Sequence, residues 1–258
     1  MDLDFTPAQR RFRSEARDWL RSHVPTAKLA SYDTREGFEQ HRAWEATLAE
    51  GGWSSVIWPK ELGGRGADLI EWLIFEEEYH AANAPMRVNQ NGILLLGPTL
   101  MEFGTAEQKA RFLPRMARCD DMWAQGWSEP NAGSDLAAIT SRAIRDGDDY
   151  VINGRKWWIS GVRNPACKLL ILMGKTDTSA PRHQQHSTII IPRDTPGVTI
   201  VRDLKLLGTL NPPGGEVEMR FDNVRVPKEN LILGEGRGFE IAQGRLGPGR
   251  IHHCMRSI

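Results

Sequence analysis

The sequence predicts an α+β protein: an N-terminal all-helical domain is followed by an antiparallel β-barrel or sandwich, and the chain ends in helix. Two observations predict this order. Apolar residues recur at helical spacing up to residue 121, whereas residues 122–236 contain short β-rich runs bounded by Gly, Pro and Asp. No helical pattern separates these runs, which favours antiparallel pairing. We therefore expect domains at 1–121 and 122–236, and the first helix of a third, truncated helical domain at 237–258.

The helical half carries clear start signals. Thr6-Pro7-Ala8-Gln9 is a capping box with proline at the first helical position, and Pro25 should end that helix. Asp68 and Glu71 predict another helix start. The side chains that we expect this helix to bury are Leu69, Trp72, Leu73 and Phe75. Further helices are expected to carry Phe38, Trp44 and Leu48, and Leu94 to Leu96 up to Gly104.

The β half is predicted from turn residues and alternation. Asn153-Gly154 between two β-rich runs predicts a hairpin with a type I′ turn. Further strands are expected at 169–173, 188–191, 198–201 and around 217–221, where apolar and charged residues alternate. From Gly238 the pattern is helical, and Gly247-Pro248-Gly249 should interrupt it. We expect this last helix to expose an apolar face.

Composition excludes several classes of partner. The chain has 258 residues with 33 Lys+Arg and 33 Asp+Glu, and a zero net charge argues against nucleic acid or an anionic membrane as main partner. No run approaches the roughly 18 apolar residues of a transmembrane helix. The acidic start, Met1 to Phe5, contains no apolar signal region. We therefore expect a cytoplasmic location, with mitochondrial or peroxisomal location left open.

Common catalytic and metal signatures are missing from the sequence. No Walker A, zincin or nucleophile-elbow motif occurs. Gly234–Gly238 resembles a dinucleotide fingerprint, but Phe239 stands where the third glycine should be, so a sharp strand-to-helix turn is favoured. Adjacent helical histidines point about 100° apart, so His252-His253-Cys254 is interpreted as ordinary helix positions, and we expect no metal site.

Two segments suggest a ligand site. Trp127–Asp135 combines hydroxyls, Asn, Gly and Pro, which suits a loop that presents N–H groups and hydroxyls to an anion. The alternative is a plain turn rich in turn-forming residues. In Lys156–Gly161, two adjacent tryptophans should face opposite sides of a strand, so one can pack in the core and the other stack on a planar ligand. The alternative is packing alone.

Taken together, these segments closely resemble the acyl-CoA dehydrogenase family. S-E-P-N-A-G-S-D followed by Y-V-I-N-G-R-K-W-W-I-S-G corresponds to the family's T-E-P-x-A-G-S-D and N-G-x-K-x-W-I-T. The resemblance extends through G-G-R-G, G-T-A-E-Q-K and F-D-N-V-R-V-P, and so covers essentially the whole chain. The closing F-E-I-A-Q-G-R-L-G-P-G-R-I-H-H-C-M-R is most similar to the branch whose animal members include proteins with a phosphotransferase-like domain.

The resemblance implies an FAD-dependent enzyme that oxidises acyl-CoA thioesters to trans-2-enoyl-CoA, with helical, β and four-helix-bundle domains. The cofactor-binding residues that it implies are Gln125, Gly126, Trp127, Ser128, Ser134, Trp158, Ile159 and Ser160. The substrate-binding residues that it implies are Ser134, Leu95, Leu96, Thr99, Gly247, Pro248, Gly249 and Arg250. The implied partners are acyl-CoA, electron-transfer flavoprotein or a similar acceptor, and further copies of the chain in a tetramer or dimer.

The catalytic base is the point at which the sequence departs from the family. The family's usual Glu or Asp would lie beyond residue 258, and its alternative position corresponds to Gly249, so the catalytic residue is unknown. We therefore expect a fragment or a truncated product that can be inactive on its own, because the catalytic carboxylate lies outside it. Two alternatives stay open: a non-catalytic module that binds flavin, acyl-CoA or another protein, and a relative that oxidises a substrate without CoA, such as a nitroalkane or amine.

Overall fold

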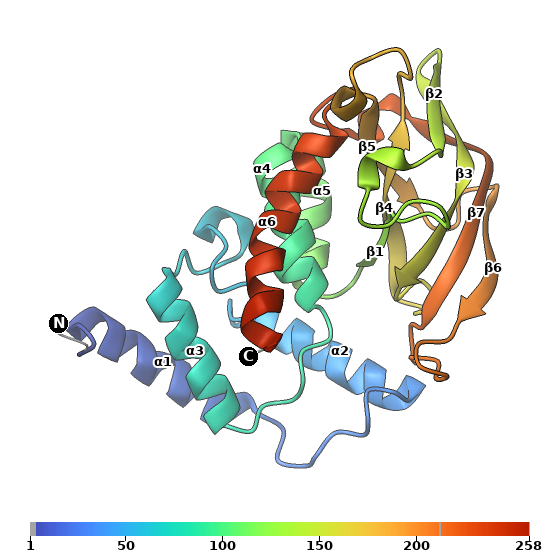
Figure 1. The fold of residues 1–258 in the computed structure, drawn as a ribbon. Helices are drawn as coiled ribbons and strands as arrows, with labels where there is room; N and C mark the ends of the chain where they lie inside the picture. Colours follow the sequence, from blue (N-terminus) through green and yellow to red (C-terminus); the bar gives the residue numbers. More distant parts are fainter. Residues whose placement is uncertain (1–3, 212, 258) are drawn as a thin grey trace. The chain divides into compact units, whose positions relative to one another are not determined.

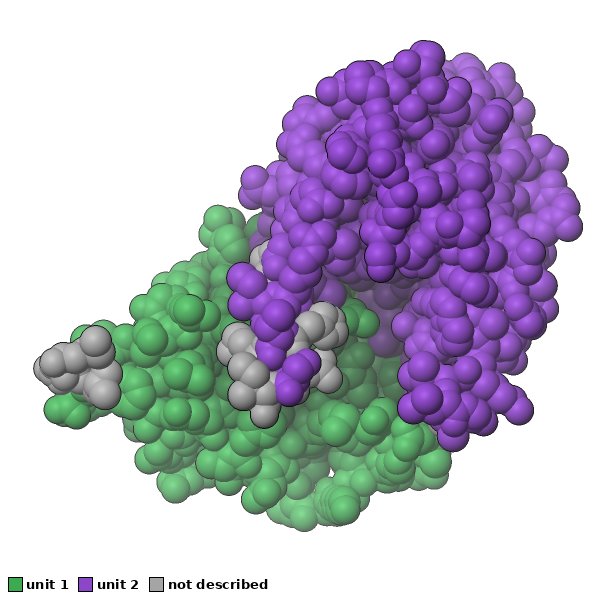
Figure 2. All heavy atoms as spheres, viewed as in Figure 1, with its two compact units in different colours: residues 1–93, 113–120 green, residues 94–112, 121–258 purple. Residues whose placement is uncertain are grey.

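A computed structural model describes residues 4–211 and 213–257. The side chains of five residues lie outside the described set, although their backbone belongs to a helix: Pro248, His252, His253, Met255 and Arg256. The chain divides into two compact units, Met1–Ile93 with Leu113–Asp120, and Leu94–Phe112 with Asp121–Ile258 (Figure 2). Each unit is considered by itself.

The first unit is helical, with a core of aromatic side chains. Its elements are α1 (Pro7–His23), α2 (Arg35–Glu50), the 3₁₀ turn η1 (Lys60–Leu62) and α3 (Leu69–Ala81). Both predicted capping boxes are confirmed: Thr6 Oγ1 accepts from the N–H of Gln9 at 3.2 Å, and Asp68 Oδ1 accepts from the N–H of Glu71 at 2.8 Å. The core includes Ala16, Leu20, Trp44, Leu48, Trp53, Phe75 and Tyr79.

The predicted inward face of α3 is partly wrong. Phe75 is buried and Trp72 half-buried, but Leu69 is 71% exposed and Leu73 is 51% exposed. Positions two residues apart lie about 200° around an α-helix, so Leu73 and Phe75 cannot both face the same core. The residues that α3 buries are Ile74, Phe75, Glu78 and Tyr79.

Three helices contribute to the second unit. They are α4 (Gly97–Phe103), which follows the π turn η2 (Gly92–Leu96), the first part of α5 (Ala106–Ala117), and α6 (Gly238–Ser257). The predicted interruption of the last helix is wrong, because α6 runs without a break through Gly247-Pro248-Gly249. A proline removes one backbone donor and bends a helix more readily than it ends it. Helix α6 packs against α4 and against the sheet (Figure 1).

The rest of the second unit is a mostly antiparallel, eight-stranded sheet. The strands are β1 (Met122–Gly126), β2 (Arg142–Asp146), β3 (Asp149–Ser160), β4 (Cys167–Lys175), β5 (His186–Pro192), β6 (Val198–Leu204), β7 (Glu216–Pro227) and β8 (Leu231–Ile232). Their order is β6-β7-β3-β2-β4-β5-β8, with β1 beside β4. Among the strand pairs of the described residues, β1–β4 and β2–β4 are parallel and the others antiparallel. This arrangement confirms the predicted fold class of a helical part followed by an antiparallel β part.

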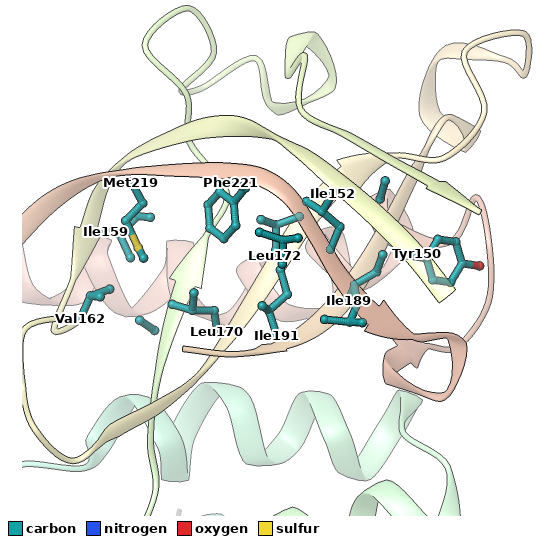
Figure 3. Close-up of a cluster of buried hydrophobic side chains, with 14 of the residues drawn as sticks. Tyr150, Ile152, Ile159, Val162, Leu170, Leu172, Ile189, Ile191, Met219 and Phe221 are labelled. Atoms are coloured by element: carbon teal, nitrogen blue, oxygen red, sulfur yellow. The ribbon is translucent and has the colours of Figure 1, made fainter. Parts of the chain in front are cut away.

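One face of the sheet forms an apolar core. Tyr150, Ile152 and Ile159 of β3 lie among side chains of β4, β5 and β7 (Figure 3). Three short 3₁₀ turns connect the strands: η3 (Leu136–Ala138), η4 (Arg182–Gln184) and η5 (Lys228–Asn230).

The predicted hairpin turn at Asn153-Gly154 is wrong. Both residues lie inside β3, and the hairpin is formed by β2 and β3 around Gly147, whose φ is +65°. A Cβ atom built on Gly154 would lie 2.1 Å from Ser141 Oγ. Gly154 therefore permits a close approach between two segments of chain rather than a change of direction.

Candidate functional site

The loop after β1 is joined to β3 by a buried ion pair. Glu129, at 2% exposure, accepts from Lys156 Nζ at 2.8 Å, and Lys156 is fully buried. Lys156 Nζ also donates to the Trp127 carbonyl at 2.8 Å. Glu129 accepts further bonds from the N–H groups of Thr140 at 2.7 Å and Ser141 at 2.9 Å. Both ends of the loop are thus fixed by one carboxylate and one ammonium group.

The electrostatics of this pair follow from its burial. Burial acts to raise the pKa of Glu129, but the attraction of Lys156 and the hydrogen bonds outweigh it and lower the pKa to about 2. Burial lowers the pKa of Lys156 to about 8, even though Glu129 opposes this shift. Both groups are therefore charged at neutral pH. Sequence analysis missed the pair, although each of the two quoted motifs contains one of its members.

A backbone hydrogen bond also places the two predicted segments next to each other. The N–H of Trp157 donates to the carbonyl of Ser128 at 3.0 Å. The loop Trp127–Asp135 and the end of β3 are therefore neighbours and do not point into separate regions of the unit.

A cleft of about 480 Å³ opens beside this loop. Its lining residues are Gln125, Trp127, Ser128, Gly133, Ser134, Asp135, Leu136, Ala137, Arg182, His183, Phe239, Gln243, Leu246 and Arg250. The structure thus brings together five of the residues that sequence analysis assigned to cofactor or substrate: Gln125, Trp127, Ser128, Ser134 and Arg250. The cleft lies wholly within the second unit.

The remaining residues assigned to the cofactor do not line this cleft. Ile159 is buried in the core of the sheet (Figure 3), and Gly126 is buried within β1. Trp158 and Ser160 are exposed, and Ser160 Oγ donates to Glu216 at 2.8 Å. Trp158 is 43% exposed and has a φ of +52°, a strained value for a bulky residue.

The remaining residues assigned to the substrate lie on helices. Leu96 and Thr99 are buried and Leu95 is half-buried, and none of the three lines the cleft. The Thr99 hydroxyl donates to the Leu95 carbonyl at 2.7 Å, so it serves the helix. Gly247 and Gly249 have open space where a side chain would be, and the side chain of Pro248 is outside the described set.

One wall of the cleft is backed by a buried cation from α6 that sequence analysis also missed. Arg245 is 7% exposed, donates to the Gln125 side-chain oxygen, and lies with its guanidinium carbon 5.0 Å from the centre of a Trp127 ring. Burial lowers the pKa of Arg245 to about 10. The Nε atoms of Arg245 and Trp127 are both buried, and neither has a hydrogen-bond partner within the described part of the chain.

The rim of the cleft is polar and its inner wall apolar. Arg182 donates to both carboxylate oxygens of Asp135, at 2.7 and 2.6 Å. His183 stacks on Phe239 with ring centroids 4.3 Å apart. Hydroxyls and arginines at the rim beside indole and aliphatic groups suit a ligand with both planar apolar and anionic parts.

Among the side chains that the structure describes, no three His, Cys, Asp or Glu gather as a metal site would require. No described helix combines the length and apolar character needed to cross a membrane.

Comparison with known proteins identifies the family. Residues 6–120 match the family model of the acyl-CoA dehydrogenase N-terminal domain, and residues 124–224 match that of the acyl-CoA dehydrogenase middle domain. Among curated proteins, acyl-CoA dehydrogenase family member 10 of Mus musculus is 44% identical over 228 residues, which are 83% of this chain. Acyl-CoA dehydrogenase IpdE1 of Mycobacterium tuberculosis is 37% identical over 241 residues, which are 91% of this chain.

A solved structure has a similar fold. The crystal structure of the ChsE4-ChsE5 complex from Mycobacterium tuberculosis matches with a TM-score of 0.76 and 31% identity over 96% of this chain. These similarities cover 21% of the mouse protein, 61% of IpdE1 and 62% of the ChsE4-ChsE5 chain. Two domains of the family match this chain in order, and the curated relatives align with most of its length. This chain therefore belongs to the acyl-CoA dehydrogenase family.

Proposed function

We propose that the chain is part of an FAD-dependent enzyme that oxidises an acyl-CoA thioester to a trans-2-enoyl-CoA. The observation that carries the proposal is the loop Trp127–Asp135, which hydrogen-bonds to β3 and forms one side of the 480 Å³ cleft. Loop and strand supply the two motifs by which the sequence resembles the family.

The residues present fit FAD. The buried indole N–H of Trp127 has no partner in the described part of the chain, and Trp158 exposes an aromatic face on the neighbouring strand. Ser128 and Ser134 bring hydroxyls to the cleft, where Arg250 adds a positive charge. In this proposal Gln125–Ser128, Ser134 and Trp158 hold the cofactor. FAD, when bound, supplies the acceptor for the hydride from the β-carbon.

The protein's own contribution is orientation and exclusion of water. Trp127, Leu246 and Phe239 form an apolar wall, so a thioester that binds against them loses its hydration. In such a place, hydrogen bonds to the thioester carbonyl are stronger and make the α-proton more acidic. The rigid ion pair of Glu129 and Lys156 keeps the loop from adjusting during this step.

The α-proton needs a base, and the cleft offers only a paired carboxylate. Among the described lining residues Asp135 alone carries a carboxylate, and both its oxygens accept from Arg182. An ion-paired carboxylate is a weaker base than a free one. The proposal therefore assigns proton removal to a carboxylate outside the described lining of the cleft.

The described lining of the cleft offers no unpaired carboxylate. This observation also favours a second candidate, a module that binds flavin or acyl-CoA without turnover. Formation of enoyl-CoA by the purified chain with an artificial electron acceptor would exclude this candidate. Absence of turnover together with tight FAD and acyl-CoA binding would favour it over the first.

Partners and location are proposed from the sequence. They are acyl-CoA, electron-transfer flavoprotein or a similar acceptor, further copies of the chain, and a cytoplasmic location. The related ChsE4-ChsE5 assembly of Mycobacterium tuberculosis is itself a complex.

The decisive experiment measures flavin uptake. The chain is purified, mixed with FAD, separated from free FAD, and its visible flavin absorption is recorded before and after acyl-CoA is added. Bound flavin that loses its absorption with acyl-CoA supports dehydrogenation. A folded chain that retains no flavin contradicts the proposal.

A further inference from the structure

Arg245 places a positive charge directly behind the cleft. Its guanidinium donates to the side chain of Gln125 and lies over Trp127, and both of these residues line the cleft. Leu246, the next residue of α6, lines it as well. The charge is therefore separated from the cleft only by the side chains of its wall.

This charge has no negative partner among the described residues, unlike the other deeply buried cations. Lys156 pairs with Glu129 at 2.8 Å, and the mostly buried Arg87 pairs with Glu45 at 2.9 Å. Arg245 donates to a neutral amide, and its Nε has no acceptor within the described residues. Buried charges in proteins are normally paired, because leaving one unpaired is costly.

We propose that the ligand of this cleft carries an anionic group that binds Arg245, so that acyl thioesters with an acidic substituent on the acyl chain are preferred over neutral ones. This inference rests on the proposed function, since it names the class of acyl group that the cleft accepts. It assigns Arg245 as a residue that determines specificity.

The position of Arg245 indicates which part of the ligand bears the anion. Arg182 is 62% exposed at the rim, where it can meet phosphates that stay near solvent. Arg245 instead lies next to the indole of Trp127, on the apolar side of the cleft. The part of a thioester that enters this apolar region is the acyl chain, so a thioester that brings an anion to Arg245 carries it on that chain.

Arg245 has the hydrogen-bonding capacity for such a group. A guanidinium has five N–H donors and can bind a carboxylate with two of them. Gln125 is half-buried and neutral, so a carboxylate that displaces or joins its amide oxygen adds charge compensation that Gln125 cannot give. A hydrogen bond from the guanidinium to a carboxylate is stronger than its bond to the neutral amide of Gln125.

The test compares two thioesters of equal chain length, glutaryl-CoA with a terminal carboxylate and pentanoyl-CoA without it. Their dissociation constants are measured by calorimetry on the wild-type chain, R245M, R245K and R237M. Arg237 precedes the same helix, is half-exposed and pairs with Glu240 at 2.7 Å, which makes R237M the matched control for loss of one arginine.

We expect wild type and R237M to bind glutaryl-CoA about tenfold or more tightly than pentanoyl-CoA, R245K to keep part of this preference, and R245M to lose it. Equal affinities in wild type, or an unchanged preference in R245M, overturn the inference. Equal weakening of both thioesters in R245M also overturns it, because Arg245 would then recognise the coenzyme part that they share.

A second measurement separates this inference from the proposed function. If neither thioester binds and no FAD is taken up, the proposed function fails, and the thermal unfolding midpoint with and without inorganic phosphate decides whether Arg245 is an anion site. A stabilisation by phosphate in wild type and R237M that is absent in R245M supports the anion site. The same shift in all three variants shows a merely structural arginine.

Discussion

Lys156 and Glu129 form an ion pair of 2.8 Å that is almost completely shielded from solvent and joins the middle of β3 to the loop after β1. The same ammonium group donates to the Trp127 carbonyl. The pair therefore holds together the two segments that form one side of the cleft. We expect its loss to lower the free energy of unfolding of the chain.

Replacing Glu129 by Gln should be strongly destabilising. The substitution leaves Lys156 buried without a negative partner, for which the expected cost is about 3–5 kcal/mol. Urea unfolding followed by tryptophan fluorescence measures it. Lys228→Met breaks the exposed pair with Asp148, 2.6 Å long, and serves as control with little expected change. Similar stabilities of the two variants would contradict the role given to the buried pair.

The stability of the chain should fall on mild acidification because of His186. Burial, followed by the nearby positive charge of Lys175, lowers the pKa of His186 from 6.5 to about 4. Between these values the unfolded chain binds a proton that the folded chain does not, so stability increases with pH across this window and is lost as pH falls through it.

His186→Leu should flatten this dependence, which urea unfolding at several pH values between 6.5 and 4 will measure. His80, whose side chain is 81% exposed, provides the control substitution His80→Leu. A slope that His186→Leu leaves unchanged would assign the acid sensitivity to other groups. Glu129 is separable from this effect, because the stability that follows from its pKa of about 2 is lost only at more acidic pH.

Trp158→Ala should weaken FAD binding without unfolding the chain. The indole is 43% exposed at the end of β3, so its removal leaves no cavity in the core. Loss of one aromatic stacking contact corresponds to a dissociation constant up to about tenfold higher. Fluorescence quenching of FAD on titration with the chain measures it. Trp72→Ala, which removes a half-buried tryptophan of the first unit, should leave the affinity unchanged.

Local signals in the sequence predicted local structure well. The capping boxes at Thr6 and Asp68 depend only on residues three positions apart, so they could be found without knowledge of the fold. The adjacency of the Trp127–Asp135 loop and β3 was expected only through the resemblance to a family. No pattern within either segment encodes a contact between Glu129 and Lys156, which are 27 positions apart.

The misses at Leu69, Leu73 and Arg245 have a common physical cause, which is that burial is decided by distant parts of the chain. Leu69 and Leu73 have the apolar character of core residues, yet the core of their unit lies on the other side of α3. Arg245 has the character of a surface residue, yet its helix packs against the sheet and buries it beside Trp127. Periodicity gives the faces of a helix but not which face meets the rest of the protein.

Gly154 allows the sharpest test of the difference between a turn and a close approach. If Gly154 were needed for a turn, Gly154→Ala would cost about 1 kcal/mol, and a change at Ser141 would not relieve it. In the structure, a Cβ atom added to Gly154 would lie 2.1 Å from Oγ, 2.4 Å from Cβ and 2.8 Å from Cα of Ser141.

Gly154→Ala should therefore cost about 3 kcal/mol or more by overpacking, and adding Ser141→Gly should restore part of the loss, because two of the three clashing atoms disappear. A double-mutant cycle in urea measures the coupling. Gly247→Ala is the control, since nothing lies within 4 Å of its new methyl group and alanine favours a helix. Additive effects of the changes at Gly154 and Ser141 would mean that the two segments do not touch at this point.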